Sequence, residues 1–351
     1  MITFYFFNIT EFQDLLYPLI ELLKQNKKVT IFLFDCLEKK RQFKYYEKKE
    51  LISYIEEILS INNCDIPPIF HFGQNEKKQY DHVYTSTKPS LILMQGIYHK
   101  NAKWIPEIDQ DMSKVIHFAW GLDGPYNIER TPYKNITMNV VRRESQMYAY
   151  HKYNSKCFGN LRTSQLLHTP INKNINTLNS IKKQNKKICF IPERWIRSKK
   201  NKKNVIKVTN DIISYLKKKD YYVIFKKREK GWPYSESYNV INELTEKPDL
   251  VIDKDLYYPT SIIFFPLHVD ICLFIGTTSV IWDLDEMGMQ DKTIIYDYKK
   301  DNIEDVKKFI DTNAIKSNFK SDNKKITNIK NKKDLPSKKI INYLLKNIFV
   351  N

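Results

Sequence analysis

Glycine is scarce in this chain, with 8 residues among 351. Neither GxGxxG nor GxxxxGK(S/T) occurs, so the two glycine-dependent phosphate-binding loops are absent from the sequence. The five cysteines lie far apart without a CxxC pair, and no HExxH is present, so the sequence contains no recognisable zinc motif. We expect buried thiols in a reducing compartment and no bound metal.

The sequence also lacks a long uniform apolar run. The most apolar stretch, Ser261–Trp282, contains His268 and Asp270, which interrupt the ~20 apolar residues that a membrane-spanning helix needs. The N-terminus is apolar, but it carries no basic region and no small-residue cleavage site, so we expect no signal peptide. These observations favour a cytoplasmic protein.

Basic residues are in excess, since 58 Lys+Arg against 40 Asp+Glu give a formal net charge of +18. Such an excess is typical of proteins with an anionic partner, such as nucleic acid, a nucleotide or a membrane face. Lys, Asn and Ile are abundant together and the lysines are scattered, which favours compositional drift as the main cause. No nucleic-acid-binding signature is present, so we expect no nucleic-acid partner. A peripheral contact with an anionic membrane at the inner face stays open.

Apolar strands alternate with amphipathic helices along most of the chain. Met1–Asn8 and Val29–Phe34 are predicted to be buried strands, with a helix from Glu11 to about Gln25 between them. The alternation begins again with the strand Ile188–Ile191. This order predicts an α/β protein made of two Rossmann-like parallel-sheet domains that face each other across a cleft.

The polar, basic and unperiodic segment 171–187 is interpreted as the linker between the two domains. The expected domains are therefore 1–170 and 188–351. In open parallel sheets ligands bind at the carboxyl ends of the strands, so we expect the site between the domains.

The sharpest local signal follows the predicted buried strand Ile271–Ile275. Gly276, Thr277, Thr278 and Ser279 come directly after this strand and precede a predicted helix. Hydroxyls and free backbone N–H groups at a helix N-terminus can bind an anion, and glycine lets the backbone approach a phosphate closely. A Ser/Thr helix cap without any ligand gives the same pattern.

Asp283 lies four residues after Ser279, one turn along the same helix face. A carboxylate at this position could accept hydrogen bonds from ribose hydroxyls. The alternative is a solvated acid in the first turn, which the helix dipole favours in any helix.

The N-terminal half offers candidates for a base and for cations. His117 lies at the end of an apolar strand, and Asp123 follows it in the loop GLDG. Either could deprotonate an acceptor hydroxyl, although a core histidine and a turn aspartate have the same sequence pattern. Arg142 and Arg143 at a predicted helix start could bind an anionic acceptor or pair with acids on the surface.

The segment Asp270–Tyr298 resembles the donor-nucleotide segment of GT-B glycosyltransferases. It is most similar to the branch of the CDP-glycerol glycerophosphotransferases and UDP-N-acetylglucosamine 2-epimerases. Three further pieces resemble this branch in the right order, namely KCFGNLRTSQLL (156–167), KKICFIPERW (186–195) and KKDYYVIFKKREKGWP (218–233). The resemblance implies that Arg194, Lys226 and Arg228 neutralise a leaving diphosphate.

The resemblance implies a metal-independent glycosyltransferase without a cofactor, which moves a sugar from a nucleotide-activated donor to a hydroxyl of a glycan or lipid-linked acceptor. The first domain would bind the acceptor and the second the donor, and the last helix would pack back on the first domain. The two histidines of the glycerophosphotransferases are replaced in this chain. A nucleotide-sugar 2-epimerase, a glycerophosphate-type transferase and a non-catalytic nucleic-acid-binding protein are the alternatives.

Overall fold

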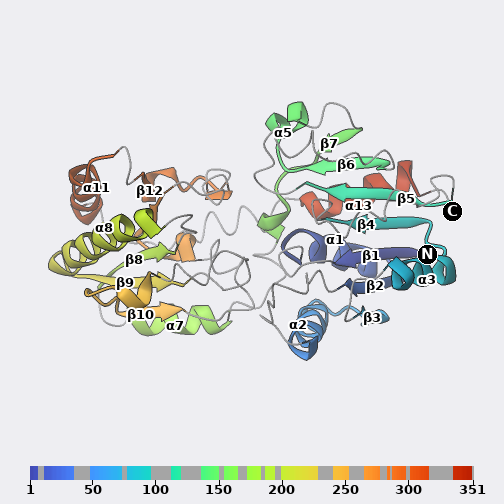
Figure 1. Ribbon diagram of the computed structural model, residues 1–351, viewed down its shortest axis with the longest axis horizontal. Helices are drawn as coiled ribbons and strands as arrows, with labels where there is room; N and C mark the ends of the chain where they lie inside the picture. Colours follow the sequence, from blue (N-terminus) through green and yellow to red (C-terminus); the bar gives the residue numbers. More distant parts are fainter. Residues whose placement is uncertain are drawn as a thin grey trace. The chain divides into compact units, whose positions relative to one another are not determined.

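The computed structural model describes residues 1–6, 12–34, 48–72, 77–95, 112–119, 136–149, 154–164, 172–182, 186–193, 199–227, 240–252, 265–276, 283–284, 287–297, 301–315 and 335–349. The chain divides into two units (Figure 1). Unit 1 consists of Met1–Gln42, Tyr46–Thr169 and Lys332–Asn351, and unit 2 consists of Phe43–Tyr45 and Pro170–Asn331. Each unit contains one parallel sheet with helices packed on it.

Unit 1 is built on a seven-stranded parallel sheet with the order β3-β2-β1-β4-β5-β6-β7. The strands are β1 (Ile2–Phe6), β2 (Val29–Phe34), β3 (Ile69–Phe72), β4 (Leu91–Met94), β5 (Lys114–Phe118), β6 (Met138–Val141) and β7 (Ser155–Cys157). The helices are α1 (Phe12–Lys24), α2 (Lys48–Ile61), α3 (Lys77–Thr87), α5 (Glu144–Ala149), the 3₁₀ helix η3 (Leu161–Ser164) and α13 (Pro336–Asn347).

The middle of this sheet is apolar on both faces, as parallel sheets require. All residues of β1 and β4 are buried. The buried side of α1 is made by apolar residues at helical spacing, among them Leu15, Leu19 and Leu22, which are fully buried. The sequence therefore folds the first strand and helix as predicted, because burial and period agree.

The last helix, α13, belongs to unit 1 and packs against α1 and η3. Its Ile340, Ile341 and Leu344 are fully buried. The ring of Tyr343 lies 5.4 Å from that of Phe158, between ring centroids. The C-terminal residues of the chain thus complete the core of the unit that the N-terminus begins.

Unit 2 is built on a five-stranded parallel sheet with the order β10-β9-β8-β11-β12. The strands are β8 (Lys187–Pro192), β9 (Tyr221–Lys226), β10 (Leu250–Ile252), β11 (Ile271–Ile275) and β12 (Thr293–Tyr296). The helices are α7 (Asn172–Lys182), α8 (Lys199–Lys218), α11 (Ile303–Ile315) and the 3₁₀ helices η4 (Ile241–Glu243) and η5 (Gln290–Lys292). The two sheets confirm the predicted fold class of two parallel-sheet α/β domains.

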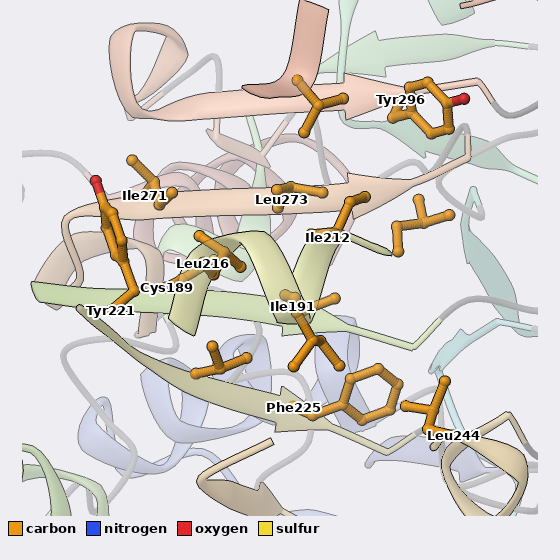
Figure 2. Close-up of a cluster of buried hydrophobic side chains, with 14 of the residues drawn as sticks. Cys189, Ile191, Ile212, Leu216, Tyr221, Phe225, Leu244, Ile271, Leu273 and Tyr296 are labelled. Carbon is orange, nitrogen blue, oxygen red and sulfur yellow. The ribbon is translucent and has the colours of Figure 1, made fainter. Parts of the chain in front are cut away.

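The core of unit 2 lies between α8 and the sheet. Figure 2 shows Ile212 and Leu216 of α8 beside Ile191 and Leu273, which come from two neighbouring strands. The helix α11 is joined to α8 by the hydroxyl of Tyr215, which donates to the carboxylate of Asp311 at 2.9 and 3.0 Å. Two helices thus cover the strands whose carboxyl ends form the edge described below.

The segment 171–187, interpreted from its sequence as an unperiodic linker, consists largely of the helix α7. Leu178 and Ile181 are buried and lie three residues apart, so they form one short apolar stripe. Lys187 is already the first residue of β8. The polar segment is therefore helical over most of its length, and its role as the linker stays a prediction.

We expect Ile341→Ala to lower the free energy of unfolding by about 2–5 kcal/mol, because a fully buried side chain in α13 is removed and leaves a cavity. Lys339→Ala on the exposed side of the same helix is the matched control, with an expected change within about 0.5 kcal/mol. Urea denaturation of both variants measures the difference. Equal stability of the two would contradict the packing of α13 on unit 1.

Candidate functional site

Each sheet is doubly wound, so each has one point where the strand order reverses. In unit 2 the chain runs from β8 outward to β10 and returns on the other side with β11, so the reversal lies between β8 and β11. In unit 1 the reversal lies between β1 and β4. Ligands of doubly wound sheets bind at the carboxyl ends of the strands at this reversal. The candidate site residues are therefore those that follow β8, β11, β1 and β4.

The ladder between β8 and β11 is short. It pairs Ile271 with Cys189 and Cys272 with Phe190, although both strands continue beyond these pairs. The carboxyl-terminal halves of the two strands therefore do not share a continuous hydrogen-bonded register. The reversal between these two strands is the point at which ligands bind in doubly wound sheets.

Gly276 follows β11 at this edge. Its φ of 99° lies in the region that favours glycine, and its backbone N–H donates to the carbonyl of Tyr296 at 2.6 Å. The glycine thus ends the strand and redirects the chain at the reversal point. Thr277, Thr278 and Ser279, the hydroxyl residues predicted to bind the diphosphate, lie outside the described residues.

Lys226 is the last residue of β9 and is only 1% exposed. Its ammonium donates to the carbonyl oxygen of Lys227 at 3.3 Å. The predicted diphosphate partner therefore lies at the carboxyl edge of the sheet, with its side chain buried. The other two predicted cations, Arg194 and Arg228, lie outside the described residues.

Glu193 is a residue that our sequence reasoning did not select, although it follows β8 at the reversal point. Its backbone N–H donates to the carbonyl of Lys226 at 2.7 Å. Its Oε1 accepts the N–H of Val240 at 2.7 Å. The position directly after the first strand of the unit is the signal that could have identified it.

Asp283 is buried, with 4% of its surface exposed. Its backbone carbonyl accepts the N–H of Met287 at 3.2 Å. Burial excludes the alternative of a solvated first-turn acid. Asp283 therefore stays a candidate for recognition of a ligand hydroxyl.

The positive charge of the chain is concentrated in one segment of unit 2. Residues 170–230, which include α7, β8, α8 and β9, contain 19 Lys+Arg and four Asp+Glu. This segment therefore carries a formal charge of +15, most of the +18 of the whole chain. A field of this sign attracts an anionic ligand to unit 2.

The carboxyl edge of unit 1 contains a buried polar cluster. A guanidinium nitrogen of Arg142, which follows β6, bonds to Oδ2 of Asp14 in the first turn of α1. The same oxygen accepts Nε2 of Gln95, which follows β4, at 2.8 Å. Gln95 also donates to the carbonyl of Ala119, which follows β5, at 3.4 Å. We call Asp14, Gln95 and Arg142 the edge cluster.

The structure changes the interpretation of the two arginines. Arg142 was expected to meet an anionic acceptor or a surface acid, but it is 8% exposed and its partner is the buried Asp14 of its own unit. Gln146 fixes its backbone, since its Oε1 accepts the N–H of Arg142 at 2.9 Å. Arg143 is partly exposed, and its carbonyl accepts the N–H of Gln146.

His117 lies inside the core of unit 1 and is fully buried. Its Nδ1 is 2.9 Å from Oδ1 of Asn139. Because an amide oxygen can only accept, Nδ1 carries the hydrogen. Burial lowers the pKa of His117 from 6.5 to about 3, although the bond to Asn139 acts in the opposite direction. We therefore correct the expectation of a catalytic base at His117, since a neutral histidine enclosed by the core has no access to an acceptor. Asp123 lies outside the described residues.

Within the described part of the chain, no group of three or more His, Cys, Asp or Glu side chains is arranged to hold a metal ion. In the same ranges, no helix is long and apolar enough to cross a membrane. Cys64, Cys157, Cys189 and Cys272 are free thiols.

Solved structures with the same fold are numerous, whereas no protein-family model and no curated protein matches the chain. The UDP-GlcNAc 2-epimerase from Methanocaldococcus jannaschii in complex with UDP-GlcNAc and UDP has a TM-score of 0.61 at 13% identity, covering 98% of this chain and 99% of that chain. The UDP-GlcNAc 2-epimerase from Neisseria meningitidis bound to UDP-GlcNAc has a TM-score of 0.60 at 14% identity, covering 99% and 100%. The glycotransferase of kitacinnamycin has a TM-score of 0.55 at 9% identity, covering 98% of both chains. The fold is therefore GT-B-like, as the resemblance implied.

We expect His117 to make unit 1 sensitive to acid. A histidine with a pKa of 6.5 when unfolded and about 3 when folded binds more protons in the unfolded chain. The stabilisation that the neutral histidine contributes is complete above pH 6.5 and is lost as the pH falls toward 3. The loss reaches about 2 kcal/mol at pH 5. The variant His117→Gln has no titratable group at this position. Between pH 7 and pH 5 its free energy of unfolding should therefore fall by about 2 kcal/mol less than that of the parent protein, as measured by urea denaturation. An identical pH dependence in both proteins would show that His117 is accessible to solvent.

Proposed function

We propose that the protein is a metal-independent glycosyltransferase that binds a nucleotide-activated sugar in unit 2 and transfers the sugar to a hydroxyl of a glycan or lipid-linked acceptor bound by unit 1. The observation that carries the proposal is the carboxyl edge of β8 and β11. There a short ladder and Gly276 with a positive φ coincide at the reversal point of the sheet, in a unit that carries a strongly basic segment. This combination suits a diphosphate.

The donor site is completed by residues that the resemblance implies. Thr277, Thr278 and Ser279 donate to the diphosphate together with free backbone N–H groups. Asp283 accepts the ribose hydroxyls, which suits a buried carboxylate without bulk water around it. Lys226, Arg194 and Arg228 offset the charge that develops on the leaving diphosphate. The names of solved neighbours mention UDP and UDP-GlcNAc, which supports a uridine nucleotide as the first donor to test.

The transfer needs one base, and Asp123 is the candidate that remains after His117 is assigned to the core. Asp123 takes the proton of the acceptor hydroxyl, and the oxygen attacks the anomeric carbon of the sugar. The bond between that carbon and the diphosphate oxygen breaks, and the nucleoside diphosphate leaves with the electron pair. No electron transfer and no external cofactor enter this balance. Transfer assays with lipid-linked and with soluble acceptors identify the acceptor. They also test whether the protein contacts a membrane that carries it.

A nucleotide-sugar 2-epimerase is the second candidate, because several of the solved neighbours are UDP-GlcNAc 2-epimerases. Inversion at C2 must break a carbon–hydrogen bond, whereas transfer leaves that bond intact.

The two activities are separated by incubating the protein with UDP-GlcNAc in deuterated water and following the sugar by proton NMR. For the transferase we expect the C2 proton to be retained and UDP to be released in proportion to added acceptor. Deuterium at C2 without any acceptor would establish the epimerase instead.

We expect Thr278→Val to weaken UDP binding by about 1–3 kcal/mol, because the shape is kept while one hydroxyl donor is lost. Thr312→Val is the matched control, since Thr312 is exposed on α11 and its hydroxyl donates to the carbonyl of Lys308. Calorimetric titration with UDP measures both. If Thr278→Val binds UDP as tightly as the parent protein does, the hydroxyl segment is not part of the donor site.

A further inference from the structure

We propose that the edge cluster of Asp14, Gln95 and Arg142 makes unit 1 select a neutral, hydroxyl-rich acceptor over an anionic one. This inference deepens the proposed function and rests on it, because it concerns the acceptor of the same transfer. It assigns Asp14 and Gln95, which carry no sequence motif, to recognition of the acceptor.

The cluster lies where a ligand of unit 1 is expected. Gln95 directly follows β4, Asp14 lies in the helix that follows β1, and the strand order reverses between these two strands. Arg142 directly follows β6 at the same carboxyl edge. Three segments that are distant in sequence thus place polar side chains on one end of the sheet, which is the position of ligand sites in doubly wound folds.

The charge of the cluster is compensated inside unit 1. The side chains of Arg142 and Asp14 are 8% and 3% exposed and are in direct contact. In such surroundings a guanidinium and a carboxylate in contact present almost no net charge to a third group. An arginine that served an anionic acceptor would need its charge available.

The hydrogen-bonding capacity of Asp14 also favours a hydroxyl. Both Gln95 and Arg142 bond to its Oδ2. Its Oδ1 is buried and has no hydrogen-bond partner within the described residues. A buried carboxylate oxygen needs a donor, because burial without one is costly. A sugar hydroxyl supplies a donor, whereas a phosphate or carboxylate group supplies only acceptors and a repelling charge.

The cluster reaches the surface through its outer members. Arg142 is 8% exposed and Gln146, which holds the backbone of Arg142, is 9% exposed. In the proposed complex an acceptor hydroxyl passes these two residues and donates to the unsatisfied Oδ1 of Asp14. The arrangement therefore binds a polyol by its hydroxyls and gives no advantage to an anion.

The test measures dissociation constants by NMR titration, in the presence of saturating UDP, for a panel of methyl hexosides and for the corresponding uronic acids. We expect the parent protein to bind the neutral glycosides at least tenfold more tightly than the uronic acids. Asp14→Asn removes the compensating charge, so we expect it to reverse this order in favour of the uronic acids. A merely structural role of Asp14 would weaken both classes equally.

Two further variants keep the test decisive. Glu21→Gln removes a carboxylate from the same helix, where Glu21 contacts Ser337 of α13 instead of the sheet edge, so it should leave the preference unchanged. If Asp14→Asn fails to fold, the double variant Asp14→Asn/Arg142→Gln restores a neutral cluster and should prefer neutral glycosides with weaker affinity.

The outcomes separate the two proposals. If the parent protein does not bind UDP, the proposed function is overturned. If the parent protein binds UDP, three results would overturn only the edge cluster as the acceptor site. These are a preference for uronic acids, no binding of either class of sugar, and an equal loss of affinity for both classes in Asp14→Asn.

Discussion

Parallel pairing is the constraint on which the rest of this protein depends. Because every strand of a sheet runs in the same direction, all carboxyl ends meet at one edge, and the connecting segments must return over the faces as helices. Both faces of the central strands are then covered, so every residue of β1, β4 and β11 is buried. Polar groups that are needed for binding can only collect at the edge, as Gln95 and Lys226 do.

The two units differ in their electrostatics. In unit 2 the segment around β8, α8 and β9 carries a large positive charge, and Lys226 is buried beside the point where the sheet reverses. In unit 1 the buried guanidinium of Arg142 is compensated by Asp14. In the proposed function, this difference would attract a charged donor to unit 2 but not a neutral acceptor. The attraction would act before the ligand makes contact, since electrostatic forces have a longer range than packing contacts.

Long, strongly patterned elements were predictable from the sequence, and short polar ones were not. The strands Val29–Phe34 and Ile271–Ile275 have the bounds that their runs of β-branched and apolar residues predict. The helices α3 and α7 lack a broad apolar face, so their sequence pattern does not predict a helix. In α7, Leu178 and Ile181 are buried, and two apolar positions three residues apart are too short a pattern to predict a helix.

The sequence by itself determined the fold class and drew attention to the segment around Gly276, because composition and hydrophobic period are local properties. Only the tertiary structure decided the roles of His117, Asp14 and Arg142. A histidine at the end of an apolar strand can face a ligand or the core, and packing beside Asn139 encloses it in the core. The pairing of Asp14 with Arg142 joins residues 128 positions apart, and no local pattern predicts a contact that exists only once the sheet has brought two strand ends together.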